Sequence, residues 1–177
     1  MICIFFISGS KFQKSIPLNS NWTKWLQKQP YPFYNCLVLN FPQLIGEYRA
    51  FYKKCQKKYN NVKIGVLGLS SGGYYAIRLS NMIKSDFCIT VCPIVDPIFR
   101  RNFLLQKNIV IPTPNVRKIQ KIKTNKKLMI VGKNDEDAPL EMYSYLDDYQ
   151  VVDKGHEIVS QMDILVSRLI TKFLKKV

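Results

Sequence analysis

Short apolar runs alternate along this chain with longer stretches in which polar and apolar residues are mixed. Runs this short and this continuously apolar are typical of parallel strands covered on both faces, and the mixed stretches are typical of the helices that connect them. The strand candidates are 2–8, 36–40, 62–69, 87–94, 127–132 and 149–152. The pattern therefore predicts an α/β fold, with a doubly wound, mainly parallel sheet of about six strands and helices on both faces.

Helices are predicted between these runs, over 21–29, 42–59, 71–84, 139–146 and 157–176. The stretch 95–125 breaks the alternation, because three prolines punctuate it and it shows no clear strand periodicity. In a sheet enzyme, an irregular stretch between two strands is where a small cap or lid is inserted over the site. We therefore expect one domain over 1–177, with 95–125 as a possible cap, and no repeat or linker marks a second domain.

Apolar residues make up 47% of the chain, but none of the runs approaches the roughly 18 residues that a membrane-spanning helix needs. The opening run 2–8 has no basic segment before it and no cleavage site after it, so we interpret it as a buried strand rather than a secretion signal. The five cysteines form no C-x-x-C pair, which favours small buried side chains in a reducing compartment over a zinc or redox site. These features predict a cytoplasmic protein without a metal or cofactor.

The formal net charge of +15 is the most unusual bulk property of the sequence. A basic surface attracts nucleic acid, anionic membrane or an acidic protein, and no nucleic-acid-binding motif accompanies this charge. The alternative is that lysines at solvated helix ends reflect composition alone. An acidic protein partner or anionic substrate is the functional interpretation that stays open.

The segment 62–76 carries the clearest chemical signal. Gly68, Ser70 and Gly72 form a Gly-x-Ser-x-Gly motif directly after a predicted strand and directly before a predicted helix. On so sharp a turn the serine backbone is strained, and side chains two residues before and after it would collide, so glycine serves at both places. The turn predicts Ser70 as an exposed nucleophile near a helix N-terminus.

A serine hydroxyl becomes an effective nucleophile only when an adjacent base, usually histidine, takes its proton. His156 is the single histidine, and it follows the last predicted strand. The acid that orients it should come from an intermediate strand end, where Asp135 is the first carboxylate after 127–132. Asp137 and, after the preceding strand, Asp96 are the alternatives.

An acyl-transfer site also needs two N–H donors for the oxyanion. The amide of Ser71, directly after the nucleophile, is the first candidate, and the amide of Ser10, in the loop that leaves the first strand, is the second.

Together these residues resemble the α/β-hydrolase superfamily over almost the whole chain. Residues 68–80 (GLSSGGYYAIRLS) resemble the elbow and following helix of small bacterial esterases of YqiA type. The Ser-Ser-Gly elbow and the tryptophans of 22–26 are also similar to the retinoblastoma-binding-protein serine hydrolases. The compact, lysine-rich character is similar to short esterases that release pimeloyl chains from acyl carrier protein in biotin biosynthesis. The chain departs from the superfamily in its first loop, where Ser8-Gly9 replaces the usual His-Gly.

The resemblance implies a serine carboxylesterase or thioesterase that works through an acyl-enzyme without a cofactor. The substrate would then be a small acyl ester or thioester, or an acyl chain carried by an acidic partner such as acyl carrier protein. The alternatives are an acyltransferase with the same triad and a non-catalytic binding protein on a hydrolase scaffold. If a partner is recruited, the basic residues in or beside the supposed cap are best placed to bind it, namely Arg100, Arg101, Arg117, Lys118, Lys121 and Lys123.

Overall fold

The computed structural model describes residues 1–8, 21–36, 40–83, 85–110 and 117–177. Within these residues, six strands form one sheet in the order β2-β1-β3-β4-β5-β6, and every neighbouring pair is parallel. The predicted α/β class and parallel sheet are thereby confirmed. The strands are β1 (Ile2–Ile7), β2 (Phe33–Cys36), β3 (Lys63–Leu69), β4 (Phe87–Val91), β5 (Lys127–Gly132) and β6 (Gln150–Val152).

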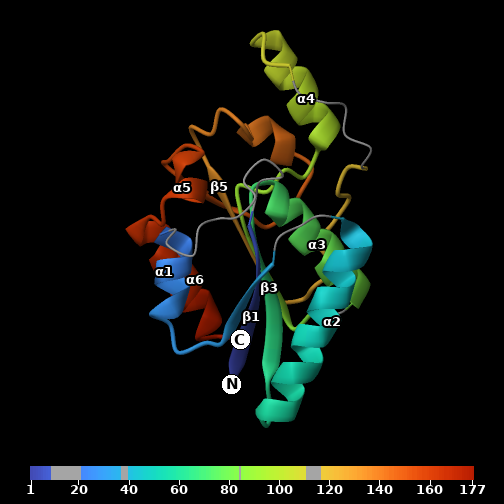
Figure 1. The fold of residues 1–177 in the computed structure, drawn as a ribbon. Coiled ribbons are helices and arrows are strands. Elements are labelled where there is room, and N and C mark those ends of the chain that lie inside the picture. Colours follow the sequence, from blue (N-terminus) through green and yellow to red (C-terminus); the bar gives the residue numbers. More distant parts are fainter. Residues whose placement is uncertain (9–20, 37–39, 84, 111–116) are drawn as a thin grey trace.

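Helices cover both faces of this sheet (Figure 1). Helices α2 and α3 lie on one face, whereas α1 and α6 lie on the other, and α4 stands beyond the edge where the strands end. The helices are α1 (Asn21–Gln27), α2 (Phe41–Lys58), α3 (Ser71–Ile83), α4 (Pro97–Gln106), α5 (Glu157–Ser160) and α6 (Ile164–Leu174), with a 3₁₀ turn η1 (Leu140–Tyr143).

The alternation of side chains along β1 shows how two cores arise from one sheet. Phe5 and Ile7 pack into the core under α2 and α3, while Ile4 and Phe6 pack into the core under α1 and α6. All four side chains are fully buried. Because both faces are covered, neither face needs polar residues, which explains the nearly continuous apolar runs.

The strand order reverses direction between β1 and β3, since β2 lies on one side of β1 and the later strands follow on the other. In open parallel sheets, ligands bind at the carboxyl ends of the strands beside such a switch point. Ser70 directly follows β3 and therefore lies at this position.

Four local predictions were wrong or incomplete. The second strand lies at Phe33–Cys36 rather than 36–40, and residues 37–39 lie outside the described residues. The predicted helix 139–146 is only the turn η1. The predicted terminal helix is two helices, because Asp163 caps α6 through the amides of Leu165 and Val166. Helix α4, inside the stretch 95–125, was not predicted.

All five cysteines are buried, as the sequence predicted. Among the described residues, no helix combines the length and the apolarity that a membrane span requires.

Candidate active site

The turn between β3 and α3 holds Ser70 in a strained conformation. Its φ of 50° lies in the left-handed region, which costs a residue with a side chain about 1–2 kcal/mol. Backbone hydrogen bonds to the end of β4 hold it there: the Ser70 N–H donates to the Val91 carbonyl (2.9 Å), and the Ser70 carbonyl accepts from the Ile94 N–H (3.1 Å). The elbow is therefore braced by the main chain of the neighbouring strand.

The two glycines of the motif are needed for close approach and not for their own dihedral angles, since none of the described glycines has a positive φ. A Cβ on Gly68 would lie 2.5 Å from the Gly72 carbonyl oxygen. A Cβ on Gly72 would collide with the carbonyl oxygen of Ile7 and lie 2.8 Å from that of Ser8. The end of β1 thus packs directly against the elbow.

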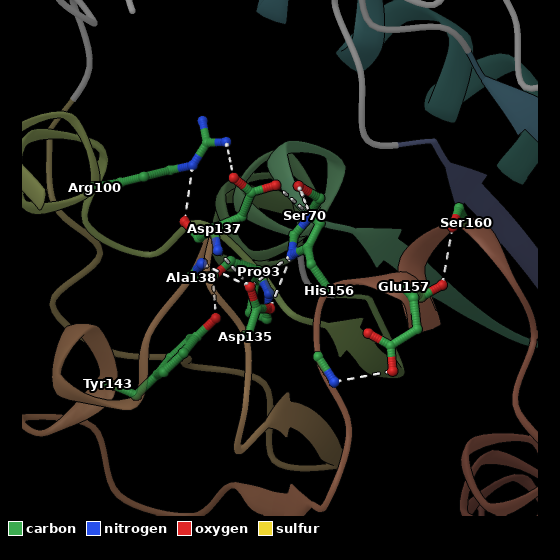
Figure 2. A network of polar contacts seen from close by, with 11 residues as sticks. Ser70, Pro93, Arg100, Asp135, Asp137, Ala138, Tyr143, His156, Glu157 and Ser160 are labelled. Carbon is green, nitrogen blue, oxygen red and sulfur yellow. Dashed lines mark hydrogen bonds and ion pairs between the residues drawn. The ribbon is translucent and has the colours of Figure 1, made fainter. Parts of the chain in front are cut away.

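His156 follows β6 and precedes α5, and its ring reaches the serine. The Nε2 atom lies 3.2 Å from the Ser70 Oγ, within hydrogen-bond reach. On the other side of the ring, Nδ1 lies 2.8 Å from Asp135 Oδ2 and 3.0 Å from Oδ1 (Figure 2). The structure therefore brings together, in one chain of contacts, the three residues that the sequence predicted as a triad.

Asp135 follows β5 and is held by its own loop. Its side chain is fully buried, and Oδ1 accepts the amide N–H groups of Asp137 (2.9 Å) and Ala138 (2.8 Å). These two bonds hold the carboxylate in place independently of its contact with His156. They leave Oδ2 as the oxygen that faces the imidazole most closely.

Burial by itself raises the pKa of Asp135, but the hydrogen bonds and charge around it outweigh burial. His156 contributes most to this, and the Cys92 thiol and the Ala138 amide add to it, so the pKa of Asp135 lies below its usual value. Asp135 is therefore an anion at neutral pH, and an anion is what stabilises an imidazolium.

Cys92 is a neighbour of the triad that sequence reasoning missed. It follows β4 with a φ of 44°, is fully buried, and its thiol hydrogen-bonds to Asp135. Burial, together with the charge of Asp135, raises the pKa of Cys92 well above its usual value, so the thiol stays protonated and donates. Next to it, the Tyr143 hydroxyl donates to the Pro93 carbonyl (2.9 Å). Apart from the position of Cys92 at a strand end, nothing in the sequence indicates these contacts.

The two alternative acids, Asp137 and Asp96, do not face His156 Nδ1. An Asp137 oxygen is 3.7 Å from His156 Nε2, on the side of the ring that faces Ser70, and its other oxygen is 3.6 Å from Arg100. Asp96 caps α4 by accepting the Phe99 amide, and it does not join this group. Of the three candidate acids, Asp135 is the one that contacts the imidazole nitrogen that points away from Ser70.

The two predicted oxyanion donors can be placed in part. Ser71 begins α3, so its amide lies at the helix N-terminus, where the first N–H groups have no partner within the helix. Ser10 lies outside the described residues.

Five of the six basic residues predicted to bind a partner can be placed by their contacts or by the hollow that they line. Arg100, on α4, turns towards the site, where its Nε donates to the Asp137 carbonyl (3.1 Å; Figure 2). Lys118 pairs with Asp96 (3.5 Å). A single hollow is lined by four of the six, namely Arg117, Lys118, Lys121 and Lys123.

In the part of the chain that the structure describes, one group of three potential metal-ligating side chains lies within 4.8 Å, formed by Cys92, Asp135 and His156. These are the atoms that already hydrogen-bond to one another around the triad carboxylate. The arrangement is suited to proton transfer to and from Ser70.

Comparison with solved structures places this geometry in a known fold. A candidate hydrolase of the α/β superfamily from Xanthomonas campestris superposes with a TM-score of 0.62 at 12% identity, covering 99% of each chain. An α/β serine hydrolase homologue from Coxiella burnetii gives 0.65 at 15% identity, over 98% of this chain and 85% of the other. The chain has the α/β-hydrolase fold.

An esterase domain from Rhodothermus marinus is similar to the same extent, with a TM-score of 0.62 at 14% identity over 99% of this chain and 86% of that domain. No family model matches the sequence. No curated protein matches it either. At these identities the likeness concerns the α/β-hydrolase fold, and the chemistry has to be argued from the site.

Proposed function

We propose that this chain is a serine hydrolase that cleaves a carboxylic ester or thioester through an acyl-enzyme. The observation that carries the proposal is the contact chain from Ser70 Oγ through both nitrogens of His156 to the buried Asp135. A strained, braced serine at the sheet switch point, next to a base and an oriented anion, is the arrangement that acyl transfer needs.

In the first half-reaction, His156 Nε2 takes the Ser70 proton while Oγ bonds to the acyl carbon, and the carbonyl oxygen becomes an oxyanion. The Ser71 amide, and in our proposal the Ser10 amide, donate to that oxygen. The bond to the leaving oxygen or sulfur then breaks as Nε2 returns the proton to it. In the second half, Nε2 takes a proton from water as the water oxygen bonds to the acyl carbon. The bond between that carbon and Ser70 Oγ then breaks, Nε2 returns the proton to Oγ, and the carboxylic acid leaves.

We further propose that 95–125 acts as a small cap over this site within a single domain. Support comes from α4, whose Arg100 contacts Asp137 beside the triad. Residues 111–116 of this stretch lie outside the described residues.

Labelling with a fluorophosphonate tests the nucleophile directly, because the probe bonds only to an activated serine oxygen. The parent protein should be labelled and hydrolyse p-nitrophenyl esters, and Ser70→Ala should lose both properties. Ser71→Ala is the matched control, since it removes the neighbouring hydroxyl but keeps the amide, and it should retain labelling. Labelling that persists in Ser70→Ala would overturn the assignment.

A second experiment uses the fact that a triad acts as a unit. Ser70→Ala and His156→Ala should each abolish nearly all turnover, and combining them should cost little more. Additive losses would contradict a shared proton-transfer step. Product analysis with an added alcohol separates hydrolysis from acyl transfer, and a protein that binds esters without any turnover would be a binding protein on this scaffold.

The finer part of the proposal is that the acyl chain is carried by an acidic protein such as acyl carrier protein. The net charge of +15 supports it, because charges around a site act mainly on the rate of encounter and are screened within about 8 Å at physiological salt. Turnover of a carrier-protein ester should fall steeply with salt, whereas turnover of a small neutral ester should not. Equal salt dependence would contradict recruitment by charge.

A further inference from the structure

A hollow of about 720 Å³ lies along α3 and opens between three parts of the chain. Tyr74, Arg78 and Asn81 line it from α3, Ile98 lines it from the start of α4, and residues 117–121 and 123 complete it. None of these residues belongs to the triad.

The lining is strongly basic. Of its ten residues none is acidic and half are cations, although basic residues are only 27 of the 177 in the chain. The cations are Arg78, Arg117, Lys118, Lys121 and Lys123. The positive charge here is thus concentrated well beyond the average of an already basic protein.

The backbone that carries these cations is fixed to α3 at two points. The Tyr74 hydroxyl donates to the Arg117 carbonyl (2.8 Å). The Asn81 side chain donates to the Lys121 carbonyl (2.9 Å) and accepts the Lys123 amide (2.8 Å). A lining held in this way is in place before a ligand arrives, so binding does not have to order it.

The cationic groups differ in how far they are neutralised. Lys118 is paired with Asp96 at 3.5 Å. The guanidinium carbon of Arg78 lies 4.2 Å from the ring centroid of Phe41, and stacking of this kind uses the flat face of a guanidinium while its donors lie around the edge. The Lys118 ammonium also lies over the Tyr145 ring, 3.3 Å from its centroid, so Arg78, Arg117, Lys121 and Lys123 are the cations left for a ligand. Several positive charges in the lining of one hollow suit a ligand group with two or more negative charges better than a single carboxylate.

The position of the hollow relates it to the nucleophile. Ser70 immediately precedes α3, and a helix rises 1.5 Å per residue, so Tyr74 lies about 6 Å and Asn81 about 17 Å along the helix from Ser70. A substrate with its acyl carbon at Ser70 can therefore place an anionic group in the hollow only if that group is several bonds from the scissile bond.

We propose that this hollow binds phosphate groups on the leaving group of the substrate. The inference rests on the proposed hydrolysis and deepens it, since it names the substrate class: esters or thioesters whose alcohol or thiol carries phosphate about 6–17 Å from the reacting carbon. Contacts to a remote phosphate then lower the barrier to acylation. They end when the leaving group departs, so they do not slow hydrolysis of the acyl-enzyme.

The test compares two thioesters with the same acyl chain and the same scissile bond. One is the coenzyme A thioester, whose thiol carries a diphosphate and a further phosphate, and the other is the N-acetylcysteamine thioester, which carries none. Lys121→Glu and Lys123→Glu should each lower kcat/KM for the coenzyme A thioester by about tenfold, since charge-assisted contacts to phosphate are lost. Both should leave the truncated thioester within about twofold, because its binding does not use the hollow.

A second basic hollow supplies the matched control. Lys53 and Lys57 line it on α2, and both are exposed, like Lys121 and Lys123. All of its lining residues belong to the second half of α2, and α2 runs away from the carboxyl edge of the sheet (Figure 1). Lys53→Glu and Lys57→Glu change the net charge equally and should leave both thioesters unaffected. In Ser70→Ala, titration with coenzyme A itself should show binding that Lys121→Glu weakens by a similar factor.

Equal losses on both thioesters, or equal losses in the α2 controls, would overturn the phosphate site. If p-nitrophenyl esters are hydrolysed but the coenzyme A thioester has no advantage over the truncated one, the phosphate site fails while the proposed function stands. If no ester is hydrolysed and no serine is labelled, the proposed function itself fails. A carrier-protein thioester offers the same phosphate chemistry on a protein, and preference for it over coenzyme A would assign the source of the phosphate.

Discussion

Replacing Asp135 by asparagine changes one heavy atom of a buried side chain and should prevent His156 from acting as a base. In the parent chain, Oδ1 accepts two amide N–H groups at 2.9 and 2.8 Å, and Oδ2 faces His156 Nδ1 at 2.8 Å. The single oxygen of the asparagine has to take the place of Oδ1, because two donors point at it. Its NH₂ group is therefore directed at Nδ1.

That orientation selects the wrong tautomer of His156. With an N–H donor facing it, Nδ1 acts as an acceptor, and the ring proton moves to Nε2, which lies 3.2 Å from Ser70 Oγ. A protonated Nε2 cannot accept the serine proton. A triad with this substitution loses about 10⁴ in kcat, which corresponds to about 5 kcal/mol in the activation free energy.

Stability should respond much less than activity. The carboxamide keeps both backbone bonds, so Asp135→Asn should lower the free energy of unfolding by only about 1–2 kcal/mol. The assay is kcat/KM on a p-nitrophenyl ester together with urea unfolding of the same preparation. Asp137→Asn is the matched control, because this half-exposed carboxylate contacts the other imidazole nitrogen, and it should stay within about tenfold of the parent. The reasoning is refuted if Asp135→Asn stays within tenfold, or if Asp137→Asn loses more.

Three further outcomes are expected. Gly72→Ala should lower the free energy of unfolding by about 2–4 kcal/mol, since the added Cβ meets backbone oxygens. Gly46→Ala should raise it by about 0.5–1 kcal/mol, because Gly46 lies inside α2 and its added Cβ meets nothing within 4 Å. Urea unfolding checks both, and a tolerated Gly72→Ala would contradict the close packing. Because the pKa of Asp135 is depressed on folding, its contribution to stability is present above the unfolded value of about 3.9 and is lost as pH falls through the folded value. Acid unfolding should therefore be less steep in Asp135→Asn, and an unchanged pH profile would show that the shift is absent. All five cysteines are buried, so a thiol reagent should react only as the chain unfolds, and rapid labelling of the native protein would contradict this burial.

The central strands could be predicted from the sequence because their apolar runs are almost continuous. The prediction for β3 was within one residue, and that for β5 was correct. Strand β2 was misplaced because it is an edge strand with partly exposed residues. The sequence of 37–39 is more apolar, so the strand was predicted too far along the chain. Helix α4 did carry a start signal, since Asp96 caps it and Pro97 opens it, but the prolines of 95–125 were interpreted as loop punctuation.

The contact between Ser70, His156 and Asp135 could be predicted because few residues of the chain were candidates for it. His156 is the single histidine, and Ser70 lies in a motif with a strict local geometry. The surroundings could not be predicted, since they depend on contacts between distant segments. Cys92 reaches Asp135 because β4 and β5 are neighbours, and Arg100 reaches Asp137 across 37 positions of the sequence.

The bracing of the elbow by the main chain leaves the surrounding side chains free to vary. Main-chain hydrogen bonds to the Val91 carbonyl and from the Ile94 N–H hold Ser70 in its left-handed conformation, so no side chain at the mouth of the site is required for it. Substitutions along α4 and 117–123 can then alter which substrates are accepted while the reactive oxygen keeps its place. Libraries for directed evolution of new selectivity should therefore randomise those two segments and leave the turn after β4 untouched.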